Sequence, residues 1–174
     1  MLIGQGALEP APGYAVVPDQ VVLAVLRELG DDDLLRVRLD REFRRLEAEQ
    51  PILAEMLSSE LSGMDGAAGQ ALAYYLFLTV CAAFREAFAA RLSEVGGHDL
   101  DRAIETLLAD GEVRSQTCIA GSYSQDVVAL WQPAVMRLVQ AEIDEAREAA
   151  DADPVLQVLL VLIVALTRAV AGPG

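Results

Sequence analysis

The chain has 174 residues, enough for one domain with a sizeable core, and 53% of them are hydrophobic although only 5% are aromatic. All 13 basic residues are arginine, and 27 acidic residues give a net charge of −14. A field of that sign repels phosphate backbones and anionic lipids, so the composition argues against nucleic acid and membrane surfaces as partners. The absence of lysine and asparagine is typical of a GC-rich bacterial genome.

Residues 1–18 are rich in chain breakers, with three glycines and three prolines. This density predicts an irregular N-terminal arm, followed by a single helical domain over residues 19–174. Asp19 is a suitable cap for a first helix, Gln20–Leu29, and Gly30 ends it. Further signals predict a second helix that begins at the acidic triplet of residues 31–33 and a third helix over Pro51–Leu61.

The stretch Ala67–Glu94 is expected to form one long central helix. Its middle, Ala71–Phe84, contains Thr79 as its only polar residue. A helix that is apolar on every side must be buried on every side, so the other helices should pack around it. Fourteen apolar residues are fewer than the ~20 that a membrane span needs, which favours a buried core helix.

Three helices are expected after the central one, and their ends are marked by caps and breakers. The first, Leu100–Asp110, lies between Asp99 and Gly111. A longer one begins at the S-x-x-Q capping box of Ser122 and should kink or break at Pro133. Residues 112–121 have no clear period. The sequence therefore predicts an all-α single domain of six to eight helices, with no repeat of fixed period.

The last helix, Pro154–Ala171, is expected to begin at Asp153-Pro154 and to end before Gly172-Pro173. Its eighteen residues span ~27 Å, just short of a bilayer core of ~30 Å. Gln157, Arg168 and the absence of flanking basic or aromatic belts favour a core helix over a membrane anchor. A strand over Val158–Leu166 is the alternative secondary structure. The helix would leave one face for the same helix of another subunit, formed by Val158, Val161, Ala165 and Ala169.

Metal and nucleophilic chemistry are poorly supported. His98 is the only histidine, so two-histidine zinc sites and E-x-x-H pairs are impossible, and no metal or cofactor is expected. Cys81 should be a buried reduced thiol, and two cysteines are too few for a disulfide framework, which favours the cytoplasm. A nucleophilic pair of Cys118 and His98 lacks any local signature.

Two clusters are candidates for binding. Five arginines fall within ten residues and would suit an acidic or phosphorylated partner, namely Arg36, Arg38, Arg41, Arg44 and Arg45. The alternative is an exposed face of i,i+4 ion pairs. Five aromatic residues would suit an apolar ligand beside the central helix, namely Tyr74, Tyr75, Phe77, Phe84 and Trp131. The alternative is that these rings are simple core.

The sequence has few candidate catalytic residues and a large apolar surface. These features favour a non-catalytic cytoplasmic interaction or structural protein that forms a homo-oligomer or binds another protein. A helical domain that binds a small apolar ligand is the first alternative. An enzyme built on Cys118 and His98 is the second.

Overall fold

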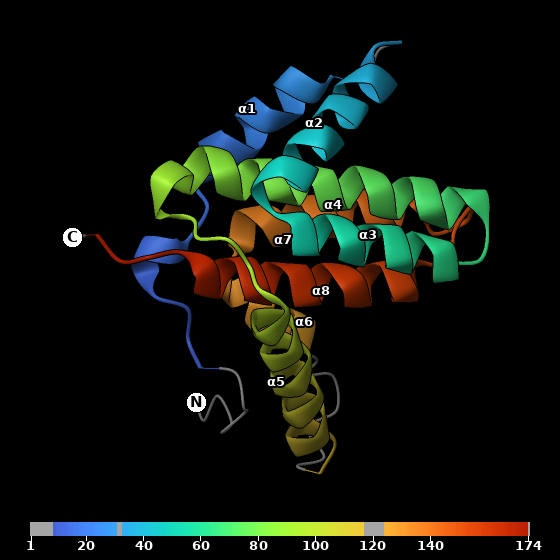
Figure 1. The fold of residues 1–174 in the computed structure, drawn as a ribbon. Coiled ribbons are helices and arrows are strands. Elements are labelled where there is room, and N and C mark those ends of the chain that lie inside the picture. Colours follow the sequence, from blue (N-terminus) through green and yellow to red (C-terminus); the bar gives the residue numbers. More distant parts are fainter. Residues whose placement is uncertain (1–8, 31–32, 117–123, 174) are drawn as a thin grey trace.

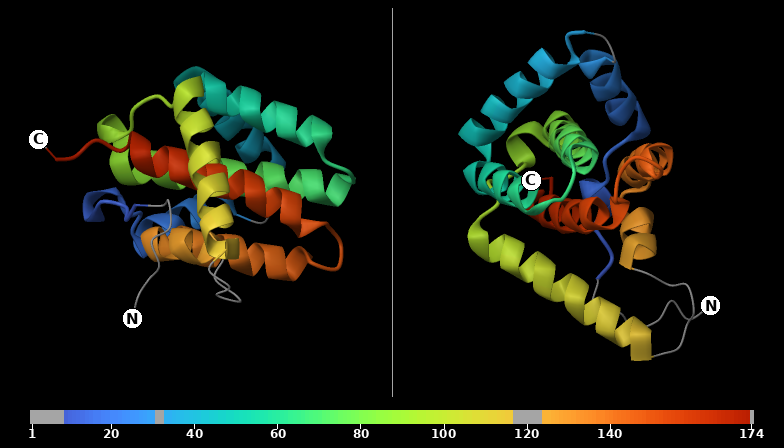
Figure 2. Two further views of the ribbon diagram at one scale, coloured as in Figure 1. Left: turned by 90° about the horizontal axis from the view of Figure 1, so that it is seen from below. Right: turned by 90° about the vertical axis from the view of Figure 1, so that its right-hand side faces the viewer.

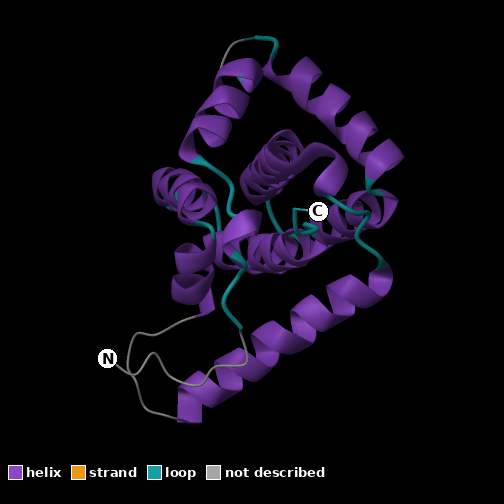
Figure 3. Cartoon of the chain, turned by 90° about the vertical axis from the view of Figure 1, so that its left-hand side faces the viewer, coloured by secondary structure: helices purple, strands orange, loops and turns teal. Residues whose placement is uncertain are grey.

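The computed structural model describes residues 9–30, 33–116 and 124–173, with the backbone alone given for residues 113–116. Within these residues the protein is an all-α single domain of eight α-helices with no strand (Figures 1 and 3). One isolated antiparallel bridge joins Leu92 to Val170. The predicted fold class is confirmed, and the region of Val158–Leu166 is helical. The capping box at Ser122 lies outside the described residues.

The helices follow one another through short connections. Their bounds are α1 Asp19–Leu29, α2 Leu35–Glu49, α3 Pro51–Gly63, α4 Ala67–Phe88, α5 Gly97–Gln116, α6 Ser124–Trp131, α7 Pro133–Ala146 and α8 Ala152–Ala169, with two 3₁₀ turns, η1 Gly13–Ala15 and η2 Ala89–Arg91.

Three predicted helix ends were wrong. The central helix stops at Phe88, because Ala89 turns to φ 45° and the chain tightens into η2. The helix α5 begins at Gly97, two residues before the predicted cap, and Asp99 instead accepts the N–H of Gly96 from inside the first turn, at 2.9 Å. It then runs through Gly111, which was expected to end it.

The centre of the fold is a pair of helices, α4 and α8, in place of the single central helix that was expected. The two run side by side in the same direction, with Gly69 of α4 close to Asp151 before α8 (Figure 1). Around this pair, α4 contacts α1, α2, α3 and α7, while α8 contacts α5, α6 and α7. Every residue from Leu76 to Phe84 is buried. The apolar stretch is therefore covered on all sides, as its sequence required.

Two helices, α4 with η2 (Ala67–Arg91) and α8 (Ala152–Ala169), are long and apolar enough to cross a membrane by length and composition alone. This is weak evidence, because buried core helices meet the same criteria. In the structure the two helices pack against each other, and 61% and 56% of their most apolar windows are buried.

The described chain consists of two similar halves, residues 9–88 and 89–173. The contacts between helices of the first half recur in the second. The α1–α4 contact corresponds to α5–α8, and α2–α3 corresponds to α6–α7. Likewise α2–α4 corresponds to α6–α8, and α3–α4 corresponds to α7–α8. The right-hand view of Figure 2 shows the arrangement, with α4 and α8 central and α3 and α7 on opposite sides.

A glutamine–proline corner stands at the same point of each half. Gln50 lies between α2 and α3, and Gln132 lies between α6 and α7, 82 residues later. A residue before proline is pushed out of the helical region, and here φ and ψ are −142° and 64° at Gln50 and −129° and 64° at Gln132. The predicted break at Pro133 is thus confirmed, and the proline opens the next helix at its first position.

Each corner glutamine holds the segment that leads into the first helix of the other half. Gln132 Oε1 accepts the N–H of Val17 at 2.9 Å, and its Nε2 donates to the carbonyl of Ala15 at 2.6 Å. Gln50 Oε1 accepts the N–H of Val95 at 2.7 Å, and its Nε2 donates to the carbonyl of Ser93 at 3.0 Å. We call this reciprocal pair the glutamine clasps. The Gln132 clasp ties the part of the N-terminal arm that contains Ala15 and Val17 into the core.

The pattern of burial is similar in the two halves. Shifting by 82 residues places Leu76, Phe77 and Leu78 on Val158, Leu159 and Leu160, and all six are buried. The α1 and α5 segments correspond with a shift of 78 residues instead, which pairs the buried Val17 with the buried Val95. A changing offset hides the repeat from a search for a fixed period.

Candidate functional site

A pocket of about 340 Å³ lies beside the Gln50 corner, between α2, the end of α4 and η2. Its apolar lining includes Leu46, Leu78, Cys81 and Leu166. Its polar lining consists of Glu42, Glu49, Gln50, Arg85 and Glu94. This volume is within the range of small-molecule sites, which combine an apolar lining with a few placed polar groups.

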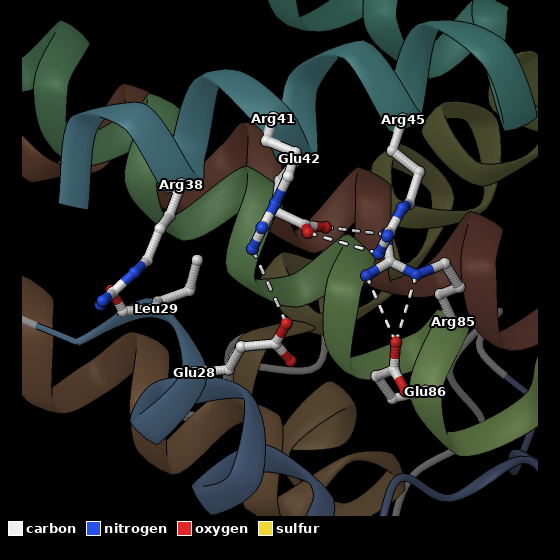
Figure 4. Close-up of polar contacts among 8 residues, drawn as sticks. All are labelled: Glu28, Leu29, Arg38, Arg41, Glu42, Arg45, Arg85 and Glu86. Carbon is white, nitrogen blue, oxygen red and sulfur yellow. Dashed lines mark hydrogen bonds and ion pairs between the residues drawn. The ribbon is translucent and has the colours of Figure 1, made fainter. Parts of the chain in front are cut away.

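An ion pair forms the inner polar wall of the pocket. Glu42 is only 6% exposed, and its Oε2 lies 2.8 Å from Nη1 of Arg85 (Figure 4). The other oxygen, Oε1, lies 3.4 Å from Nη1 of Arg45. Arg85 also reaches Glu86, at 3.4 Å. Both oxygens of the buried Glu42 carboxylate are thus held by arginine.

The charges of the wall support one another. Burial lowers the pKa of Arg85, but the adjoining carboxylates of Glu42, Glu49 and Glu86 outweigh burial and raise it above its ordinary value. Arg85 is therefore a permanent cation. Burial raises the pKa of Cys81 strongly, and Arg85 offsets only part of that effect, so the thiol is protonated at neutral pH.

The corresponding place in the second half carries other side chains. A shift of 82 residues takes Glu42 to Ser124 and Arg85 to Thr167. Thr167 is buried and accepts a hydrogen bond from Gln132 at 3.1 Å, while Ser124 donates at 2.8 Å to Asp110, which is itself fully buried. The second half thus also buries an acidic side chain here, but a glutamate and an arginine are not repeated at these two positions. Because desolvating two charges is expensive, a buried ion pair at a pocket wall is a candidate functional group.

The backbone at the pocket edge is also unusual. Ala89, which lines the pocket, has φ 45°, and it is the only non-glycine residue with positive φ in the described part of the chain. Such conformations carry a cost for a residue with a Cβ and concentrate at functional sites. The chain after α8 leaves its helix at Val170 in an ordinary extended conformation.

The arginine cluster divides between structural contacts and open solvent. Arg38 donates to the carbonyl of Leu29 at the end of α1, at 2.7 Å, and Arg41 lies 3.8 Å from Glu28 (Figure 4). Arg45 supports Glu42 at the pocket wall, as described above. Arg36 and Arg44 are exposed. Two of the five, Arg38 and Arg41, thus join α2 to α1, and a dock for an acidic partner stays a prediction.

The aromatic residues do not line this pocket. Phe77 and Phe84 are fully buried and Trp131 is 7% exposed, so these three belong to the core. The hydroxyl of Tyr74 donates to Asp40 at 3.3 Å, and burial, followed by the charge of Asp40, raises the pKa of Tyr74 to about 12. Burial and then Glu142 raise the pKa of Tyr75.

The face of α8 that was assigned to another subunit is covered in part within the chain, where α5, α6 and α7 pack against α8. Ala165 is fully buried, Val158 is 7% exposed, and Val161 and Ala169 are half-buried. Ala165 and Val158 therefore belong to the core, and a contact with another subunit stays a prediction.

Of the remaining candidates, the structure describes His98 alone. His98 is exposed in the first turn of α5, and Cys118 lies outside the described residues. The described residues hold no group of three or more histidine, cysteine or acidic side chains suited to a metal ion. No family model matches the chain, and no curated protein or solved structure matches it either.

The pocket residues were missed from the sequence, although two signals were present. The apolar stripe of α2 runs through Leu39 and Leu46, and Glu42 occupies the position between them. Arg85 directly follows the apolar run of α4. A carboxylate inside one apolar stripe and a cation at the end of another are the marks of a buried pair.

Proposed function

We propose that this protein is a non-catalytic cytoplasmic binding protein whose pocket beside the Gln50 corner takes a small polar molecule. The observation that carries the proposal is the ion pair of Glu42 and Arg85, buried at the pocket wall in a half whose counterpart is built with Ser124 and Thr167. This refines the expected ligand-binding domain: the site lies beside α4, but charged residues line it in place of aromatic ones.

The chemistry of the wall favours binding over catalysis. Arg85 is a permanent cation with two carboxylates around it, and it has no part in proton transfer near neutral pH. The thiol of Cys81 is protonated and buried, and the described wall holds no histidine to activate it. The groups present can orient a ligand by charge and cover its apolar part.

Leucine methyl groups give a direct test, because four leucines line the pocket, namely Leu46, Leu78, Leu92 and Leu166. With ¹³C-labelled leucine methyls, a library of small polar fragments should contain members that shift these four signals and leave those of Leu138 and Leu160 in the second half unchanged. Ala90→Phe, at the exposed edge of the pocket, should abolish the shifts while the circular dichroism spectrum stays helical. If no fragment shifts the four methyls, the proposal fails.

Self-association is a second candidate function, and a different surface favours it. Three large apolar side chains of the contacting helices α5 and α6 are exposed, with Ile104 at 42%, Leu108 at 64% and Leu130 at 69%. Burying such side chains is the usual driving force of subunit association. Light scattering after size exclusion should then report a homo-oligomer that Leu108→Asp dissociates; a monomeric wild-type protein at high concentration excludes this candidate.

A further inference from the structure

We propose that the ligand of this pocket is a small organic cation, an ammonium or guanidinium ion with a short apolar chain. The inference rests on the proposed function and adds the chemical class of the ligand. It is carried by the balance of charge on the wall, the state of Glu42 and the composition of the lining.

The pocket is lined by three carboxylates and one cation. Glu49 and Glu94 are exposed at its edge, and Glu42 lies inside, opposite Arg85. The positive charge of Arg85 is already shared between Glu42 and Glu86, which lie 2.8 and 3.4 Å away. A ligand entering the pocket therefore meets a net negative wall in a protein whose charge is −14.

Glu42 supplies a buried negative charge. Its Oε2 lies 2.8 Å from Arg85, its Oε1 lies 3.4 Å from Arg45, and the side chain is 6% exposed. A cation bound in the pocket would be attracted to this carboxylate through a medium of lower dielectric than water. The C-terminal end of α4, at Phe88 beside the pocket-lining Ala89, adds the partial negative charge of a helix terminus.

The apolar lining selects an organic cation over a metal ion. Leu46, Leu78 and Leu166 cover part of the wall, and hydrocarbon surface of this kind cannot replace the water of a divalent metal. It can cover a short alkyl chain. The same geometry disfavours a carboxylate or phosphate ligand, because Arg85 has no cationic partner among the residues that line the pocket.

The probes are three molecules with one pentyl chain and different head groups: pentylammonium, 1-pentanol and hexanoate. Pentylammonium should shift the methyls of Leu46, Leu78 and Leu166 in the full-length protein, and its affinity should fall as sodium chloride is added. Glu49→Gln and Glu94→Gln should each weaken it about two- to fivefold, since both carboxylates are exposed.

Two further variants sharpen the test. Glu42→Gln should weaken pentylammonium at least about tenfold, because a buried charge acts in a lower dielectric. Glu47→Gln removes an exposed charge from the same helix, away from the pocket lining, and should leave the affinity unchanged. Equal effects of Glu47→Gln and Glu49→Gln would show a general field and overturn the assignment of the site.

The outcomes separate this inference from the proposed function. Hexanoate binding in preference to pentylammonium, or equal binding of 1-pentanol, would overturn the cation while leaving a ligand pocket in place. If pentylammonium fails but other fragments shift the four leucine methyls, the cation alone is overturned. If neither pentylammonium nor any fragment shifts them, both are overturned.

Discussion

Replacing Gln132 with alanine should be among the most damaging single changes outside the apolar core. The side chain is fully buried and makes three hydrogen bonds, to Val17, Ala15 and Thr167. Alanine leaves the backbone N–H of Val17 and the carbonyl of Ala15 buried without partners, at about 1–3 kcal/mol each. The hydroxyl of Thr167 can rotate toward a carbonyl of its own helix and adds little. The expected loss is about 4 kcal/mol, from a total of ~5–15 kcal/mol.

Urea unfolding followed by circular dichroism measures the free energy of unfolding, and calorimetry should show a melting temperature about 8–16 °C lower. Gln50→Ala is the matched comparison in the first half. It should cost less, about 1–3 kcal/mol, because its partner Ser93 is exposed and water can replace the lost hydrogen bond. Gln157→Ala, exposed on α8, is the control and should stay within 0.5 kcal/mol of the wild type. If Gln132→Ala costs less than Gln50→Ala, the account of the clasps is wrong.

Three other measurements test the core and the perturbed groups. Leu76→Ala and Leu78→Ala should each lower the free energy of unfolding by ~2–5 kcal/mol in urea titrations, since both side chains are fully buried; losses below 1 kcal/mol would contradict the packing. Cys81 should react with a thiol reagent only after unfolding, because burial raises its pKa; rapid native labelling would contradict this. Tyr74 should titrate near pH 12 by ultraviolet absorbance. Since its pKa is raised on folding, its contribution to stability is complete below pH 10 and disappears between pH 10 and 12. An unperturbed titration at pH 10 would refute the contact with Asp40.

The fold class could be predicted because local signals mark most helices. Gly30 and the prolines at positions 51 and 133 coincide with observed ends or starts. The end of α4 could not be read locally, because Ala89 and Ala90 favour helix. It is set by tertiary contact: the chain leaves α4 to pair with the end of α8, where the N–H of Ser93 donates to the carbonyl of Ala169 at 3.0 Å. Gly111, a residue type that usually ends helices, lies inside α5.

The site was harder to predict than the fold, since it depends on which residues two distant segments bring together. The five arginines and the aromatic run were conspicuous in the sequence, yet much of each set serves packing or local ion pairs. Glu42 was hidden as one acid among many, and its partner Arg85 lies on another helix. The clasps were hidden for the same reason, because Gln132 and Val17 are 115 residues apart.

The two halves also allow the role of the ion pair to be separated from the demands of the fold. If the pair served stability, removing both charges should be damaging. The second half carries Ser124 and Thr167 at the two equivalent positions, and replacing a buried ion pair by apolar residues is often neutral or stabilising. Glu42→Leu with Arg85→Met should therefore restore an apolar stripe in α2 and leave the free energy of unfolding unchanged or raise it by ~1–4 kcal/mol. Arg85→Met alone should cost about 3–5 kcal/mol, because it leaves Glu42 buried with only Arg45, at 3.4 Å. A stable double variant that no longer binds any pocket fragment would assign the pair to binding, whereas a double variant as unstable as Arg85→Met would assign it to the fold.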